Sequence, residues 1–387
     1  MPLPTQLPVV GPAGSSSQAA WSVPLGTATG STATVGIDGQ RVYAADAGHQ
    51  SVAAFQASTG RAAWSGKVDG PVVAGPMLAS IDGSTRVVAA TNDHVYAWVP
   101  TTGAESGSWA TGLPGAGGVR LTVTGPVVGM DANHVRIVVG GQLVTRVVPA
   151  DATPIAPGSA GSLIVAGAPG QVWSVGSAQV AGSPIVLAAP AGTVFSAVVG
   201  SSSTRLVAAF TKSASGGSAQ VLLRAFTVGT WAPLWTTGAI PSSQAALTGS
   251  GASPLVVSPD GSWGIYGSTT VAMSTGKTAG LPTDWQTSCV GPDLAFGVSG
   301  GKVLAATPTG LTASSATAVH VTAAPGTVIG TSQVIPPQGS GDGFAFIIAS
   351  SGSNASLYAV TAPAPIPAPS PSSTSATPAA PKKSKKS

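Results

Sequence analysis

The chain has 387 residues, of which 43% are hydrophobic and 7% are charged, and its mean hydropathy is +0.36. That hydrophobic content suffices for a large core and excludes a wholly disordered chain. Glu105 is the single glutamate, and so few long charged side chains argue against amphipathic helices. The 52 glycines and 33 prolines suit short strands joined by tight turns, so the sequence predicts an all-β fold.

The charge of the chain is concentrated at its C-terminal end. Sixteen Lys and Arg residues stand against twelve Asp and Glu residues, and the whole excess comes from four lysines: Lys382, Lys383, Lys385 and Lys386. The rest of the chain is therefore neutral and has no basic patch, which argues against a nucleic-acid partner. The four lysines form either a solvated end or a weak contact with an anionic polymer or membrane surface.

The two ends differ in composition from the middle of the chain. Residues 1–18 are rich in Pro and Ser and lack the charged and apolar regions of a signal peptide. They resemble the stalk that follows an anchor, so we expect a disordered linker and an extracytoplasmic, cell-envelope location. Residues 362–387 are rich in Pro, Ser and Ala and predict an extended spacer with a lysine-rich end. Residues 19–361 are the expected folded domain, and we expect a monomer.

A repeated pattern runs through this domain: an apolar strand, a turn, a second apolar strand, Thr-Gly and then a tryptophan. The clearest copies are Arg41–Trp64 and Arg86–Trp109, and weaker copies end at Trp235 and Trp285. Near the start, Trp21 stands in the same position without the preceding strands.

The spacing of these tryptophans indicates how many copies of the repeat the chain contains. The steps from Trp21 to Trp64 and from Trp64 to Trp109 are 43 and 45 residues, and the step to Trp235 is 126 residues, or three times 42. Two copies without the tryptophan are therefore expected in that gap, at Pro126–Val148 and Ser162–Val180, and two compact copies follow Trp285, at Leu294–Ser314 and Gly343–Val360.

A period near 43 residues is typical of a four-stranded blade. The sequence thus predicts a single β-propeller of four-stranded blades, with eight blades favoured and seven if two weak copies are one. The N-terminal strand around Trp21 would complete the last blade, which closes the ring and removes a free sheet edge.

Strand, turn, strand, Thr-Gly and Trp in this order resemble the repeat of the quinoprotein alcohol dehydrogenase-like (PQQ-like) propeller family. The resemblance implies that the tryptophan at the end of each copy docks one blade against the next, a role that falls here to Trp21, Trp64, Trp109, Trp235 and Trp285. A wide buried indole whose N–H finds a fixed partner suits that role.

Enzymes of this family hold the quinone and a calcium ion with acidic and amide ligands, and many stack an adjacent cysteine pair on the quinone. The lone Cys289 cannot form such a pair and is expected to be a small buried hydrophobe. With one glutamate, a calcium cage would have to come from scattered aspartates. We therefore expect a degenerate, non-enzymatic member without a cofactor. The sequence also carries no convincing hydrolase elbow or HExxH zinc motif.

Three histidines stand out because each precedes the third strand of successive copies. His49, His94 and His134 follow Asp46, Asp93 and Asp131 in tight turns that should emerge on one face of a propeller. One hypothesis is a metal or acidic-ligand site built from these residues. The other is that Asp and Asn close the turns through their own side chains and His fills a polar position.

The sequence favours a non-enzymatic binding or scaffolding propeller of the bacterial cell envelope, with a protein, peptide or cell-wall ligand. An ectodomain tethered to an anchored protein is a variant of this interpretation. One alternative is a diverged enzyme or small-ligand binder that uses the central channel. Asp, Arg and His clustered at the channel mouth would favour it, and an apolar or Ser/Gly-lined mouth would count against it. A further alternative is a structural component of an envelope or virion.

Overall fold

Strands make up almost all regular structure in the described part of the chain. The computed structural model describes residues 7–11, 19–27, 33–35, 40–46, 49–112, 118–131, 133–150, 152–176, 183–202, 204–212, 219–245, 255–258, 260–291, 295–299, 302–311, 317–321, 327–335, 343–351 and 354–362. These residues contain no α-helix, and η2 (Ser159–Gly161) is a 3₁₀ turn. None of them lies in a helix long and apolar enough to cross a lipid bilayer. The all-β prediction is confirmed.

The first four sheets follow one another along the chain, and each has four antiparallel strands. The first sheet contains β3 (Ala33–Val35), β4 (Arg41–Asp46), β5 (Ser51–Gln56) and β6 (Ala62–Lys67). The second contains β7 (Ala74–Ile81), β8 (Ser84–Ala90), β9 (His94–Trp98) and β10 (Glu105–Ala110). The third contains β11 (Val119–Thr122), β12 (Gly125–Gly129), β13 (His134–Val139) and β14 (Gln142–Val147). The fourth contains β15 (Ala152–Pro157), β16 (Leu163–Gly167), β17 (Gln171–Val175) and β18 (Ile185–Val186).

Four more sheets complete the set, and the fifth of the series has five strands. It contains β19 (Val194–Ser201), β20 (Arg205–Lys212), β21 (Gln220–Thr227), β22 (Pro233–Thr236) and β23 (Ile240–Pro241). The sixth contains β24 (Leu255–Val257), β25 (Trp263–Tyr266), β26 (Thr269–Ala272) and β27 (Thr278–Gly280). The seventh contains β28 (Gln286–Val290), β29 (Ala295–Ser299), β30 (Lys302–Thr307) and β31 (Gly310–Leu311). The eighth contains β33 (Thr327–Ile335), β34 (Gly343–Ser351), β35 (Asn354–Ala362) and β2 (Ala19–Thr27).

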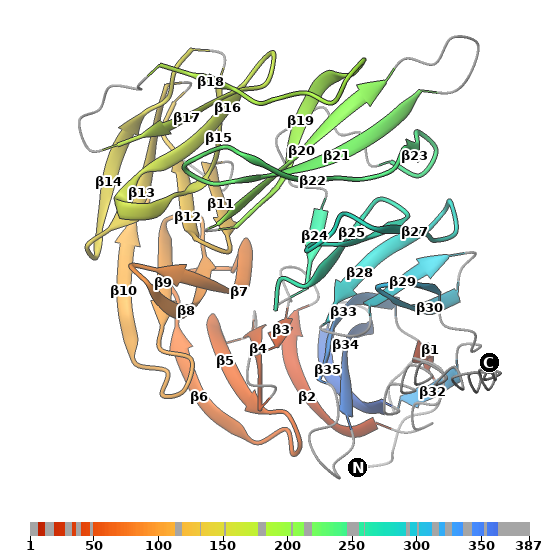
Figure 1. The fold of residues 1–387 in the computed structure, drawn as a ribbon. Coiled ribbons are helices and arrows are strands. Elements are labelled where there is room, and N and C mark those ends of the chain that lie inside the picture. Colours follow the sequence, from red (N-terminus) through yellow and green to blue (C-terminus); the bar gives the residue numbers. More distant parts are fainter. Residues whose placement is uncertain are drawn as a thin grey trace, which may run out of the picture.

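These sheets form a closed ring, the β-propeller that the repeats predict (Figure 1). Contacts between neighbouring sheets run from β3 to β7, β7 to β11, β12 to β15, β15 to β19, β19 to β24, β24 to β28, β28 to β33 and β33 back to β3. The ring is closed by the N-terminal strand, as expected, because β2 pairs antiparallel with β35 and places Val23 opposite Leu357.

The ends of the chain depart in part from the expected linkers. Within residues 1–18, a strand β1 (Leu7–Gly11) pairs with β32 (Thr317–Val321) in a separate two-stranded sheet. Backbone pairing of this kind differs from the unstructured linker that composition suggested. At the other end, Ala362 belongs to β35, and the rest of the expected tail, including its lysines, lies outside the described residues.

Three of the expected tryptophans dock on the next sheet in the same way. The Trp64 indole nitrogen donates a hydrogen bond to the Pro100 carbonyl at 2.9 Å, and its ring lies against Gly103, three residues further on. Equivalent sets are Trp21 with Ala57 and Gly60, and Trp235 with Met273 and Gly276. Each glycine has a φ between +68° and +71°, a conformation that favours glycine. The Thr-Gly of one sheet thus receives the tryptophan of the sheet before it.

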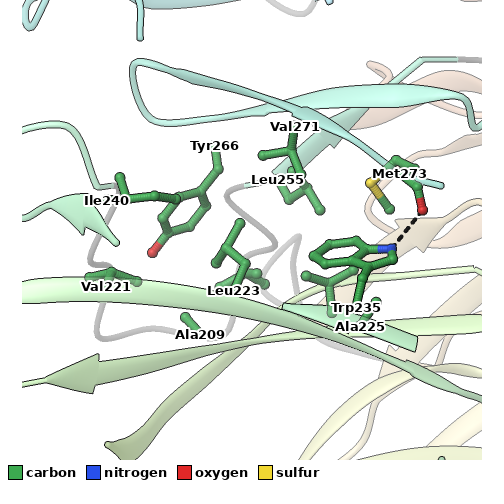
Figure 2. Packing of buried hydrophobic residues seen from close by; sticks show 12 residues of the cluster. Ala209, Val221, Leu223, Ala225, Trp235, Ile240, Leu255, Tyr266, Val271 and Met273 are labelled. Carbon is green, nitrogen blue, oxygen red and sulfur yellow. Dashed lines mark hydrogen bonds between the residues drawn. The ribbon is translucent and has the colours of Figure 1, made fainter. Parts of the chain in front are cut away.

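The packing around Trp235 shows how much of the core depends on this contact. Figure 2 shows its ring beside Met273, with Leu255 and Val271 of the sixth sheet nearby and the hydrogen bond to the Met273 carbonyl drawn. All these residues belong to one buried cluster that spans the fifth and sixth sheets. The docking tryptophan therefore joins two sheets that share no strand pairing.

Two other tryptophans depart from this arrangement. Trp109 donates to the Gly141 carbonyl in the β13–β14 hairpin of the next sheet, at 2.9 Å. Trp285 lies in the connection between β27 and β28, and its indole donates to the Thr287 hydroxyl two residues away. Trp285 thus does not end a repeat in an outer strand, contrary to expectation. Trp263 of β25 instead donates across to the Gly291 carbonyl, at 3.0 Å.

Trp231 stands where the first, second and sixth sheets have the docking glycine. Its backbone N–H donates to the Thr227 carbonyl at 2.8 Å, as that of Gly60 does to the Gln56 carbonyl, and its φ is +57°. The outer strand of the preceding sheet, β18, has no tryptophan. Trp231 packs instead into the cluster that joins β16 and β17 to β20 and β21. At this junction the indole is therefore supplied by the fifth sheet and not by the outer strand of the fourth.

Replacing Trp231 by glycine, the residue that the repeat favours, is expected to lower stability by about 2 kcal/mol. Loss of a buried indole costs about 3–5 kcal/mol, and relief of the left-handed backbone returns about 1–2 kcal/mol. Urea unfolding measures the change. Gln50→Gly is the matched control, because Gln50 is exposed at φ +47° and should lose nothing. A Trp231→Gly protein as stable as the parent would contradict the assigned packing.

Candidate functional site

The turns between the second and third strands of the first three sheets carry the predicted Asp and His residues. Because these sheets share one strand order, the three turns emerge on the same face of the ring. In the first turn, the His49 Nδ1 lies 2.7 Å from Asp46 Oδ2, and the His49 backbone N–H donates to Asp46 Oδ1 at 3.1 Å. The His49 side chain is 81% exposed, so its other ring nitrogen faces solvent.

The third turn repeats this local geometry. His134 Nδ1 lies 2.9 Å from both oxygens of Asp131, and the Asn133 backbone N–H donates to Asp131 Oδ1 at 2.8 Å. The Asn133 amide, followed by the His134 imidazole, holds the pKa of Asp131 below its usual range. This carboxylate is therefore ionised at neutral pH.

The second turn differs, because His94 pairs with an aspartate outside the turn and not with Asp93, which directly precedes it. Its Nδ1 is hydrogen-bonded to Asp69 Oδ2, from the connection between β6 and β7. Asp69 also accepts a hydrogen bond of 2.6 Å from the Thr91 hydroxyl. The Asp93 backbone carbonyl accepts the Thr111 N–H at 2.7 Å. Sequence reasoning missed Asp69, which lies 25 residues before His94 and joins it only through the fold.

We call the surface formed by these pairs the Asp–His face: Asp46 with His49, Asp69 with His94, and Asp131 with His134. The most enclosed pair is Asp69 with His94, whose side chains are 31% and 34% exposed. Tyr96 lies beside it, with its ring centroid 5.7 Å from that of His94 and its hydroxyl oxygen accepting the Asp69 backbone N–H at 3.2 Å.

Two opposing effects act on Asp69. Burial favours the neutral acid, but hydrogen bonds from Thr91 and His94, together with the electrostatic interaction with His94, outweigh it and lower the pKa of Asp69. Burial and then the nearby Asp69 carboxylate raise the pKa of Tyr96. The site therefore keeps an ionised carboxylate next to a neutral phenol at neutral pH.

Asp69→Asn is expected to make the protein less stable at pH 7 and to lose that difference in acid. A carboxyl whose pKa is lower in the folded state stabilises the fold above its unfolded pKa, near 4, and loses this effect as pH falls through the lowered value. Urea midpoints of the parent and Asp69→Asn, measured at pH 7 and pH 2.5, test the sign. Glu105→Gln, at an exposed carboxyl, is the control. A gap between parent and variant that widens in acid would contradict the assignment.

The metal hypothesis finds no support in this geometry. Each imidazole is bound to a carboxylate of its own rather than turned toward its neighbours. Across the described part of the chain, no three His, Cys, Asp or Glu side chains are grouped closely enough to hold a metal ion. What the face offers instead is three carboxylates and three imidazoles whose Nδ1 atoms are fixed. Such groups suit hydrogen bonds and ion pairs with a polar partner.

The first strands of the sheets have a different character from the Asp–His face. Among the described first strands of the eight sheets, the one charged residue is Arg120 of β11. Its guanidinium donates to the carbonyls of Pro154 and Ile155 in β15, and burial lowers the pKa of Arg120. This charge therefore joins two neighbouring sheets.

No family model matches the sequence, and no curated protein matches it. Among solved structures, BamB from Moraxella catarrhalis is 12% identical with a TM-score of 0.45, over 90% of this chain and 99% of that one. The computationally designed Ika8 protein is 13% identical with a TM-score of 0.47, over 89% and 99%. The Cps50 (Swd1) β-propeller domain of Myceliophteria thermophila is 9% identical with a TM-score of 0.42, over 88% and 98%. The propeller assignment rests on the chain's own ring of sheets.

Proposed function

We propose that this chain is a non-enzymatic, eight-bladed binding or scaffolding propeller of a cell envelope, of the PQQ-like repeat type. Its Asp–His face would bind a protein, peptide or cell-wall ligand. The observation that carries the proposal is the recurrence of an Asp–His pair on three consecutive sheets of one face. Asp–His pairs that recur on adjacent turns, with imidazoles between 34% and 81% exposed, suit binding better than packing, because loops of a rigid scaffold are the usual place for ligand contacts.

The charge of the face indicates the chemistry of its partner. The lowered pKa values of Asp69 and Asp131 keep both carboxylates ionised at neutral pH. Partner groups that donate hydrogen bonds or carry positive charge, such as Lys or Arg side chains or the amines of a cell-wall polymer, are favoured there. The rival reading, a channel-site enzyme, is disfavoured by the single charge on the described first strands.

The test is a crosslinking pull-down from the native envelope with the full chain. An Asp46→Asn/Asp131→Asn double variant is expected to lose the partners that the parent captures. Glu105→Gln is the matched control, because Glu105 is exposed and lies far from the Asp–His face. It pairs with Trp98 at one end of the β9–β10 pair, and His94 lies at the other end. Partners retained by the double variant would overturn the assigned face. Recovery of abundant cytosolic proteins alone would overturn the envelope assignment.

A further inference from the structure

Within the part of the chain that the structure describes, the hairpin formed by β25 and β26 in the sixth sheet buries three hydroxyl groups for which no hydrogen-bond partner is found. These are Tyr266 Oη, Ser268 Oγ and Thr269 Oγ1. The three residues are only 0%, 3% and 3% exposed. Native proteins leave few buried polar groups unpaired, and each one calls for an explanation. Three within four consecutive residues point to a missing partner at this place.

The backbone N–H and carbonyl of Ser268 both have hydrogen-bond partners, so the unpaired groups of this hairpin are side-chain hydroxyls. The Ser268 N–H donates to the Gln244 carbonyl at 3.0 Å, and the Ser268 carbonyl accepts the Leu281 N–H at 2.8 Å. Tyr266 and Thr269 pair directly across the turn, so their side chains lie on the same face of the sheet. That face meets the fifth sheet, because Tyr266 shares a buried cluster with Val221 and Ile240.

The surroundings of the phenol are apolar. Figure 2 shows the Tyr266 hydroxyl pointing toward Val221 of β21, close to Ile240 of β23. Burial raises the pKa of Tyr266 to about 12, so the group is a neutral phenol that can both donate and accept. Hydroxyls of Ser and Thr have the same two-way capacity. A fitting occupant is therefore small, neutral and able to both donate and accept hydrogen bonds.

We propose that the junction between the fifth and sixth sheets is a hydrated internal site, in which ordered water bonds the hydroxyls of Tyr266, Ser268 and Thr269. Buried waters in proteins typically make about three hydrogen bonds to polar groups that otherwise lack partners. Water has the required size, neutrality and double capacity. A small alcohol has the same hydrogen-bonding chemistry, and the second experiment below distinguishes a bound alcohol from bound water.

The first experiment compares urea midpoints of Tyr266→Phe and Thr269→Val with the parent. If water bonds these hydroxyls, each variant should unfold more easily, with the unfolding equilibrium constant raised about fivefold. If the junction is dry, removal of an unpaired hydroxyl should leave the midpoint unchanged or raise it, which would overturn the proposal. Thr270→Val is the control, because the Thr270 hydroxyl bonds the Ala279 and Pro308 carbonyls directly and its loss should destabilise in either case.

The second experiment identifies the occupant in the full chain. A crystal structure near 1.5 Å, grown and frozen without polyols, is expected to show solvent density within hydrogen-bond distance of Tyr266 Oη, and the density should vanish in Tyr266→Phe. Native mass spectrometry separates the two sources. Bound water leaves the mass of the folded chain unchanged after desolvation, whereas a retained alcohol adds a fixed increment that Tyr266→Phe abolishes. Such an increment would overturn the assignment to water.

Discussion

Replacement of Gly103 by alanine is expected to destabilise the propeller by about 3 kcal/mol. Gly103 has a φ of +71°, where an L-residue costs about 1–2 kcal/mol. A Cβ placed there would also lie 2.5 Å from Trp64 Cγ and 2.6 Å from its Cδ2. Because Trp64 is fixed by its bond to the Pro100 carbonyl, the ring cannot withdraw without losing that bond, and overpacking of this kind costs about 1–3 kcal/mol more.

The β7–β8 turn provides a matched control for this prediction. Gly83 has a φ of +78°, and a Cβ added to it would meet no atom within 4 Å. Gly83→Ala therefore carries the backbone strain without the contact and should lose only about 1–2 kcal/mol. The difference between the two variants in urea unfolding isolates the cost of displacing Trp64. Equal losses would show that the tryptophan does not depend on the glycine.

The docking contacts could be foreseen only where the repeat is regular. Trp64 and the Thr-Gly at Gly103 recur at a fixed period, so the sequence predicted both their presence and the junction between sheets. Trp231 could not be foreseen, because an aromatic residue at a left-handed position is disfavoured locally and is held there by packing against the neighbouring sheet. Trp285 matched the spacing by count, yet lies in a connection because the sixth sheet ends earlier, at β27.

In the candidate site, too, the sequence could predict local contacts but not the contact that depends on the fold. Asp46 with His49 and Asp131 with His134 are three residues apart, so a single turn brings each pair together and the sequence pattern suffices. His94 also has an aspartate directly before it, Asp93, but the backbone of that turn directs the imidazole to Asp69 of the preceding connection. A contact across 25 residues depends on how two sheets pack, which no local motif records.

The largest single loss is expected for Trp235→Ala, about 4 kcal/mol. Trp235 is 9% exposed and packs within the cluster between the fifth and sixth sheets, and removal of a buried tryptophan costs about 3–5 kcal/mol. The variant also loses the 2.7 Å hydrogen bond to the Met273 carbonyl. Calorimetry and urea unfolding at pH 7 measure the change, and the transition should broaden if the two sheets separate before the rest of the ring.

Trp235→Phe separates the two parts of this contact. Phenylalanine keeps much of the buried area but cannot donate to Met273. The Met273 carbonyl would still accept a hydrogen bond from Arg205 Nη1 at 3.0 Å, so it is not left unsatisfied, and the loss should be only about 1–2 kcal/mol. A Phe variant as unstable as the Ala variant would show that the hydrogen bond dominates. We instead expect Trp235→Ala to be much less stable than Trp235→Phe. That order would make the buried area between the sheets the main source of docking energy, with the indole N–H serving to orient the ring.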